Sequence, residues 1–464
     1  MQFKRPKRTP LFLALAVLAL VGTVRVWNPD FIDRAERMTY DVSVRRAQNV
    51  SAPAATNLAF VSMEDSSIAA INDGKVNGLG LGYHSGLYWQ RHIYGRLVNE
   101  LATQGAQCVA FDVLLGELRT DHSQVQMAEG GLLESDEFFA VMAQRAGNVL
   151  LAATPDVLPP LLFATNVLAL GDISTEKDSD GILRRVRAFR EVRRWDQVIK
   201  DFAALPEIGG DLARAIIQPG KILVSISGTT NFFEIGVDAE NNFQVADFVG
   251  DKLPAGMLPR AKAFTTQRVW HMGIVIAAQQ LKLDLAKAEA DLPQGRIVLT
   301  GAGGVTRVIP VDGDGFFYVD WRLTPDDSRL LRAPVEALLA QDRLRLLERT
   351  NGLRDDFRGK LVIVGSAAQG NDLTDRGATP LERNTLLVSK HWNVANSIIT
   401  GQFIHRIPLA GEIVLILLLG GLTALITWEL RAVAASVAVA LLIALYFGAA
   451  VFAFTHFRWW LPSG

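Results

Sequence analysis

Three long apolar segments constrain this chain more than any other feature, because backbone polar groups cross a lipid bilayer only inside a helix or a closed barrel. The clearest two are residues 407–428, which contain IVLILLLGGLTALIT, and residues 432–454, which carry no charge. The third, residues 11–28, opens with the uncharged run LFLALAVLALVGTV. Roughly 20 apolar residues suffice for a helix to span the hydrocarbon core. We therefore predict three transmembrane helices.

The flanking charges predict how these helices are oriented. A cluster of lysines and arginines in residues 1–10 precedes the first span and should stay in the cytoplasm. The exit of the span, Thr23 to Trp27, lacks small residues for signal cleavage, which favours an uncleaved anchor. Residues 29–406 and the short tail 455–464 would then lie outside. The predicted location is the cell (inner) membrane, with a large periplasmic or extracellular domain.

Two charged residues lie within the first and second spans. Arg25 falls near the end of the first span, and we expect its side chain to snorkel to the interface. Glu412 falls in the first turn of the second span, where a solvated end residue is a simpler interpretation than a functional carboxylate within the membrane.

The large exterior segment alternates between strand and helix patterns. Apolar runs predict strands, periodic segments predict helices, and their alternation favours a parallel sheet covered by helices. The predicted strands are 57–63, 108–115, 148–152, 221–227 and 360–364, and the predicted helices are 89–104, 135–145, 270–287 and 389–400. Residues 296–322 read instead as antiparallel strands joined by glycine and aspartate turns. The predicted fold class is α/β, with an added antiparallel section and three transmembrane helices.

Composition and motifs exclude several kinds of chemistry. The formal net charge of −1 argues against nucleic-acid binding, which needs a basic face. The single cysteine, Cys108, allows no intrachain disulfide. The seven histidines show no zinc-ligand spacing, and the chain has neither a nucleophile elbow nor a P-loop. We therefore predict no enzyme, no cofactor and no metal.

Several polar residues come at the carboxyl ends of predicted strands, the edge where ligands bind in open α/β sheets. Asp65 follows the first strand, and Asp112 interrupts the second apolar run. Asp372, Asp375 and Arg376 lie in the loop after strand 360–364. We expect a polar pocket from these residues. The alternative is that the acids only cap helices and tie loops together.

Four segments together resemble the CHASE2 sensory domain of bacterial transmembrane receptors. The segment VSMEDSSIAAI, with Trp89 and Arg91 after it, is similar to the family's first strand, acidic pair, serine and tryptophan–arginine stretch. GAQCVAFD looks like its second strand, and residues 357–380 with His391 and Asn393 look like its closing motif. The closest likeness is GDISTEKDSDGILRRVRAF, which carries Gly171, Asp180, Gly181, Arg184 and Arg185.

The resemblance covers most of residues 29–405 and implies an extracytoplasmic sensor. It adds Arg91 to the candidate ligand contacts. The middle, residues 190–300, shows no family motif. Family members usually continue after three spans into a cytoplasmic cyclase, kinase or phosphatase, so this chain is expected to be a short variant or to act on a separate effector.

The leading functional hypothesis is a membrane-anchored sensor of bacterial signal transduction that binds an unknown small molecule or protein. Its expected partners are membrane lipids and either further copies of itself or a membrane or cytoplasmic effector. The alternative is a structural or scaffold subunit of a cell-envelope complex, because a large exterior domain with short cytoplasmic parts suits that role equally well.

Overall fold

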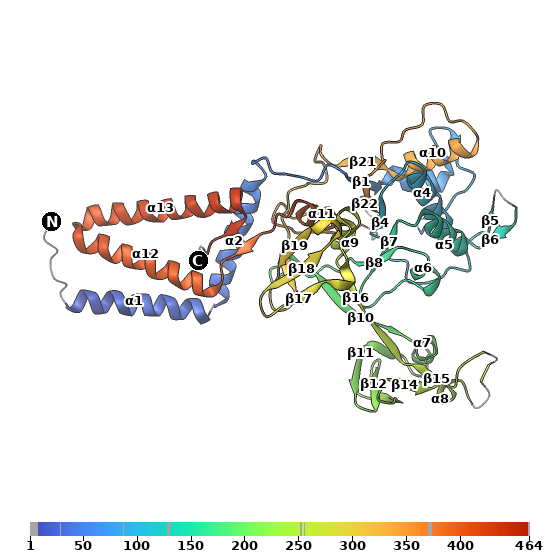
Figure 1. Ribbon diagram of the computed structural model, residues 1–464, viewed down its shortest axis with the longest axis horizontal. Helices are drawn as coiled ribbons and strands as arrows, with labels where there is room; N and C mark the ends of the chain where they lie inside the picture. Colours follow the sequence, from blue (N-terminus) through green and yellow to red (C-terminus); the bar gives the residue numbers. More distant parts are fainter. Residues whose placement is uncertain are drawn as a thin grey trace.

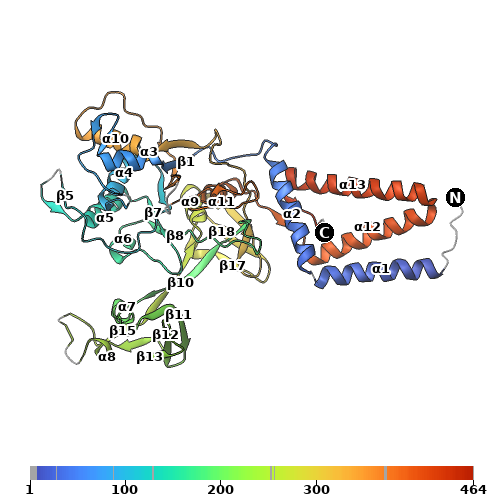
Figure 2. The same cartoon turned by 180° about the vertical axis from the view of Figure 1, so that it is seen from behind.

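The computed structural model describes residues 8–27, 29–86, 88–127, 130–250, 253–254, 256–369 and 374–462. The described chain has three parts: a bundle of long helices, a larger α/β domain, and a small β-rich insert that hangs from the domain on a two-stranded arm (Figures 1 and 2).

A six-stranded sheet forms the centre of the domain, and all its neighbouring strands are parallel. Across the sheet, the strands are β21 (Leu331–Pro334), β1 (Leu58–Met63), β22 (Leu361–Ser366), β4 (Cys108–Phe111), β7 (Val149–Ala153) and β8 (Ala169–Asp172). Every residue of β1, β22, β4 and β7 is buried, as expected for parallel strands covered on both faces. The predicted parallel sheet is confirmed.

Helices cover the sheet on both sides. Along β1, Phe60 packs into one core while Ala59 and Val61 pack into the other, because successive side chains point to opposite faces. One face carries α3 (Asp65–Asp73), α4 (Arg91–Thr103), α5 (Ser135–Ala146), α6 (Leu161–Ala164) and α10 (Val335–Leu346). The other carries α9 (Met272–Leu281) and α11 (Ser389–Thr400).

Helices α9 and α11 pack unusually closely because of one glycine. A Cβ atom added at Gly273 would lie 2.5 Å from the carbonyl oxygen of His391 and 2.7 Å from Cβ of Val394. Only a residue without a side chain allows the two backbones to approach this far. The position of α11 against the sheet therefore depends on Gly273.

Antiparallel strands extend the domain beside this second face. They form the three-stranded sheet β17 (Glu289–Asp291), β18 (Arg296–Thr300) and β19 (Thr306–Pro310), and the pair β9 (Arg185–Arg187) with β20 (Phe316–Tyr318). The predicted antiparallel section is confirmed, although its last strand pairs with β9 rather than with its neighbour in sequence.

The middle of the chain, which resembles no family motif, forms the insert. The arm consists of β10 (Phe189–Trp195) and β16 (Phe264–Trp270), which pair along their whole length. The insert contains α7 (Gln197–Ala203), β11 (Gly210–Gln218), β12 (Lys221–Ile226), β13 (Phe232–Gly236), β14 (Asn242–Gln244), α8 (Ala246–Val249) and β15 (Arg260–Lys262). It has its own small core, which includes Ile199, Val224 and Phe243.

Short elements complete the domain. They are β2 (Lys75–Val76), β3 (Leu79–Gly80), β5 (Val125–Gln126), β6 (Leu132–Leu133), β23 (Arg376–Gly377), β24 (Thr385–Leu386), β25 (His405–Arg406), β26 (Trp459–Trp460) and the 3-10 turns η1 (Leu285–Lys287) and η2 (Ala302–Gly304).

Two predicted elements are shorter than expected. The helix predicted over 270–287 ends at Leu281, because Lys282 takes a left-handed conformation with φ of 51°. The strand predicted over 108–115 ends at Phe111, which leaves Asp112 at the head of a loop. This second correction matters for the site, since it places Asp112 just past the end of β4, where its backbone N–H still donates to the carbonyl oxygen of Val364 in β22.

Three long helices, α1 (Arg8–Trp27), α12 (Leu409–Glu429) and α13 (Ala432–Phe457), lie side by side in the bundle (Figures 1 and 2). Among the described residues, α12 and α13 are each long and apolar enough to span a membrane; a third span results if α1 and α2 (Asp30–Ala47), bent by 80° to each other, count as one. Helix α2 crosses the end of the bundle next to the domain. The direction of each crossing stays a prediction.

Replacing Gly273 with alanine should push α11 away from α9. We expect a loss of about 1–3 kcal/mol in the free energy of unfolding, the usual cost of overpacking a core. Denaturant unfolding of the full chain in detergent measures this loss. Gly236→Ala is the matched control, because a Cβ there meets no atom within 4 Å. Equal midpoints for the two variants would contradict the close contact.

Candidate functional site

A cleft of about 1150 Å³ opens at the carboxyl edge of the central sheet. Its inner wall comes from the sheet and α11 and includes Asp112, Ser366 and Lys390. Its outer wall comes from the insert and its arm and includes Arg194 and Lys200. At the cleft, β22 lies between β1 and β4 in the sheet, although it is far from both in the sequence. The loops that follow these strands therefore leave the edge of the sheet in different directions. This is the place where open α/β sheets bind ligands.

The inner wall combines the carboxylate of Asp112 with two buried basic side chains, Lys390 and His391. Asp112 follows β4 directly, and its side chain is 14% exposed. His391, fully buried, places Nε2 3.5 Å from Oδ1 of Asp112, at the outer limit of a hydrogen bond. The ammonium of Lys390 is held by the carbonyl oxygen of Ile173 at 2.7 Å and by Oγ1 of Thr175 at 2.6 Å.

Burial shifts the pKa values of the ionisable side chains in the inner wall. It lowers the pKa of His391 below its ordinary value even though Asp112 lies beside it, so the imidazole is neutral at pH 7. It also lowers the pKa of Lys390. Burial alone would raise the pKa of Asp112, but His391 and Lys390 outweigh it, and the pKa of that carboxyl is lowered. The wall therefore presents an ionised carboxylate to the cleft.

The arrangement of these side chains in the inner wall suits the binding of a ligand. Lys390 is held by two oxygens, and the Nδ1 atom of His391 has no partner among the described residues. Within the same described part of the chain, no group of three histidine, cysteine or acidic residues could hold a metal ion.

The structure separates the residues that the sequence placed in one pocket. Arg91 and Asp112 line the cleft at the carboxyl edge. Asp65 and Arg376 line a second cleft of about 750 Å³ instead. Asp372 lies outside the described residues. Whether these side chains contact a ligand stays a prediction.

Local contacts explain how three of them are held. Asp65 opens α3, and its carboxylate accepts hydrogen bonds from the backbone N–H of Gln369. Arg91 opens α4 and places Nε 3.7 Å from Oδ1 of Asp136. Arg376 donates to the carbonyl oxygen of Asn384 at 3.4 Å. Asp65 thus ties a loop, as the alternative interpretation of the acids expects, and it also faces the second cleft.

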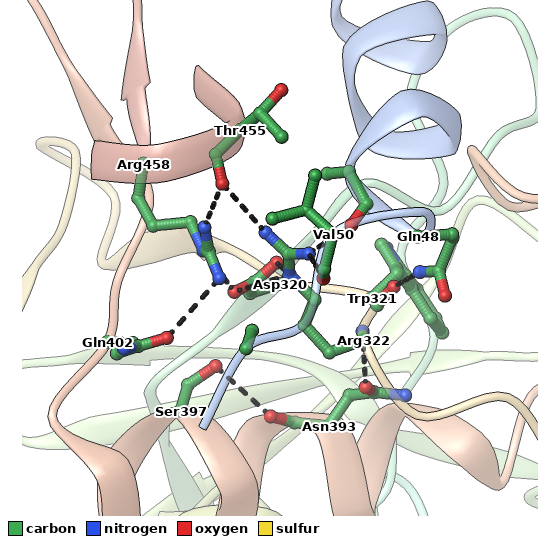
Figure 3. Close-up of polar contacts among 12 residues, drawn as sticks. Gln48, Val50, Asp320, Trp321, Arg322, Asn393, Ser397, Gln402, Thr455 and Arg458 are labelled. Atoms are coloured by element: carbon green, nitrogen blue, oxygen red, sulfur yellow. Dashed lines mark hydrogen bonds and ion pairs between the residues drawn. The ribbon is translucent and has the colours of Figure 1, made fainter. Parts of the chain in front are cut away.

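A second polar group, which sequence reasoning missed, joins the domain to the end of the helix bundle (Figure 3). Asp320 lies between two arginines: it accepts from Nε of Arg322 at 3.1 Å and from Nε of Arg458 at 2.8 Å. Each of these three residues is at most 6% exposed. Arg458 caps the end of α13, so this buried group connects a long apolar helix directly to the domain.

The same group gathers the end of α2 and the middle of α11. Arg322 donates to the carbonyl oxygens of Ala47, Val50 and Thr455. The side-chain oxygen of Asn393 accepts from the backbone N–H of Arg322 at 2.8 Å (Figure 3). We call Asp320, Arg322, Asn393 and Arg458 the membrane junction.

A third buried group ties the helix ends to one another. Arg25 donates to Glu412 at 2.7 Å and lies 3.1 Å from Glu36, and Arg406 donates to Glu36 at 2.9 Å. The expected solvation of Glu412 is wrong, because its side chain is 3% exposed and pairs with Arg25, which is 5% exposed. Buried charges of opposite sign are tolerated when each has its partner in place. The expected snorkelling of Arg25 stays a prediction.

The segment that most resembles the family holds α2 against the domain. Arg184 is 1% exposed and donates to Asp41 of α2 and to Asp178 and Asp180 at 2.8–3.0 Å. Gly181, with φ of 80°, turns the chain so that the aspartates reach back to the arginine. The physical role of this motif is a clamp on the helix that adjoins the bundle.

One helix connects the cleft with the membrane junction. Lys390 and His391 of α11 form part of the inner wall and its buried backing. The next two residues, Trp392 and Asn393, bind the segment after β20 that carries part of the junction: both donate to the carbonyl oxygen of Leu323. Helix α11 therefore contacts both the cleft and the junction.

Replacing Arg184 with methionine should leave three carboxylates without their common cation. At pH 7 we expect a loss of about 3–5 kcal/mol in the free energy of unfolding. Arg184 lowers the pKa of Asp180, so this stability is present above the unfolded-state pKa and is lost as the pH falls through the folded-state pKa. The variant should therefore show a flatter stability curve below about pH 4.

Denaturant unfolding between pH 3 and pH 8 measures this difference. Arg358→Met is the control, because that arginine is 76% exposed and pairs with only one aspartate. An equal loss in both variants would argue against the clamp.

In a comparison with protein families, residues 12–426 match the model of the CHASE2 domain. Comparison with curated proteins and with solved structures finds no match. The matched range includes the parallel sheet, both clefts, the insert and α12. The chain therefore belongs to the CHASE2 family, whose domain is an extracytoplasmic, non-catalytic sensory domain.

Proposed function

We propose that this protein is a membrane-anchored receptor in which the cleft binds the ligand and α11 passes its binding to the membrane helices. The observation that carries the proposal is the sequence of contacts along α11, from Lys390 and His391 at the cleft to Trp392 and Asn393 at the junction. A rigid helix fixed at both places is the shortest route between them.

The relay needs two states. A ligand shifts a conformational balance only through its different affinity for the two states. The junction offers discrete arrangements rather than a continuous range, because an arginine that leaves Asp320 must find another partner or stay buried without one. Ligand contact with the inner wall would favour one position of α11 and with it one set of pairs at the junction.

The placement in the cell follows the predicted topology. Helices α12 and α13 expose most of their apolar surface, since only 6% of each candidate span is buried, and this surface suits lipid. The α/β domain would face the periplasm or the exterior. A change in the packing of the bundle would then reach a second copy of the chain or an effector protein at the cytoplasmic side.

Two measurements distinguish ligand binding at the cleft from its relay to the membrane helices. Cys108 is buried, so cysteines placed at the exposed Phe12 and Val433, near the far end of the bundle, take spin labels selectively. The full chain in lipid nanodiscs is mixed with low-mass fractions of the extracytoplasmic extract of its own cells. We expect one fraction to raise the thermal midpoint and to change the distance between the labels.

Asn393→Ala tests the path. It should keep the rise in midpoint and lose the change in distance, because the cleft is intact while the segment at Arg322, which follows β20, is released. Thr400→Ala on the same helix is the control, since its hydroxyl bonds only to the preceding turn. A full distance change in Asn393→Ala would contradict the relay. No midpoint shift from any fraction would favour the scaffold role instead.

A further inference from the structure

Resting on the proposed function, we further propose the class of ligand: the cleft takes a small organic molecule with one acidic group on an apolar or aromatic body. The acidic group, a carboxylate, phosphate or sulfate, would lie against the insert. The structural basis is a group of cationic side chains on the outer wall of the cleft that form no ion pairs within the described part of the chain.

Arg193, Arg194 and Lys200 line the outer wall of the cleft. None of the three forms an ion pair with any residue in the described ranges. Arg194 donates only to the carbonyl oxygen of Pro159 at 3.0 Å, and Arg193 lies 5.7 Å above the ring of Phe264. Other arginines of the cleft differ: Arg119, for example, donates to both oxygens of Asp121 at 3.0 Å.

Two of these cations, Arg194 and Lys200, are also partly removed from water. Burial lowers the pKa of Arg194. Burial and repulsion from Arg194 also lower the pKa of Lys200, although the nearby Asp201 and Asp196 act in the opposite direction. Two like charges on a half-buried surface disfavour each other's charged form. An anion between them would relieve this repulsion and gain charge-assisted hydrogen bonds. The protein thus keeps a site that is electrostatically incomplete without a ligand.

Aromatic and aliphatic side chains define the rest of the molecule. Trp89 is 3% exposed and lines the cleft, and its Nε1–H has no acceptor among the described residues. Trp195 lies on the insert side, and Leu158 and Leu212 add aliphatic surface. Pockets of roughly 300–1,000 Å³ hold drug-sized molecules, so a cleft of about 1150 Å³ fits one such ligand.

The opposite wall limits how many acids the ligand carries. Asp112 and Asp375 both line the cleft from the side of the sheet. Their negative charges would repel a second acidic group and accept hydrogen bonds from hydroxyl or amino groups. The cleft should therefore prefer molecules that are acidic at one end only.

Three probe molecules of similar size test which sign of ligand charge the cleft prefers. Phenyl phosphate, benzyl alcohol and benzylamine are titrated against the full chain in nanodiscs, with the thermal midpoint and calorimetric Kd as readouts. We expect binding of phenyl phosphate, weakened by added salt, and clearly weaker binding of the other two. Arg194→Gln and Lys200→Gln should each raise the Kd for phenyl phosphate by about tenfold or more.

Arg214→Gln is the matched control, because this insert arginine is 83% exposed, pairs with Asp211 and lies outside the cleft. Its Kd should equal that of the natural chain. Tighter binding of benzylamine or benzyl alcohol, absence of phenyl phosphate binding, or an unchanged Kd in both cleft variants would overturn the ligand class. The proposed receptor function is contradicted only if the native extract also fails to shift the thermal midpoint.

Discussion

Buried charge at the end of the helix bundle is the constraint on which this structure depends. Arginines and carboxylates there are almost fully enclosed, and a charge removed from water is tolerated only when its partners are in place. Asp320 needs Arg322 and Arg458, and these residues come from the domain and from the end of α13. Domain and membrane helices therefore fold as one unit rather than as a globule on a flexible tether.

This constraint gives α11 its importance. The helix is buried over most of its length, is held close to α9 by Gly273, and touches both the inner wall of the cleft and the junction. A closely packed element of this kind moves as a rigid body rather than by bending. The insert completes the cleft from outside, at the end of the two-stranded arm formed by β10 and β16.

Much of the fold could be predicted from sequence because continuous apolar runs and periodic segments mark buried strands and helices. The membrane junction could not be predicted from the sequence. In Val319 to Leu323 apolar and charged residues alternate, a pattern typical of a strand with one solvated face, yet Asp320 and Arg322 are as buried as their neighbours. The sequence also could not show that Asp65 and Asp112 line two different clefts. The pattern of apolar residues predicts which residues follow a strand at the edge of the sheet, but not the path of the loops there.

Hydrogen exchange of the full chain in nanodiscs, compared between the natural protein and Asp320→Asn, tests the unity of domain and membrane helices most directly. The amides of α11 and of the last turn of α13 are the reporters. The account predicts faster exchange in both segments together, because a weakened junction releases the helix that leads to the cleft. Faster exchange at the end of α13 alone, with α11 unchanged, would contradict it.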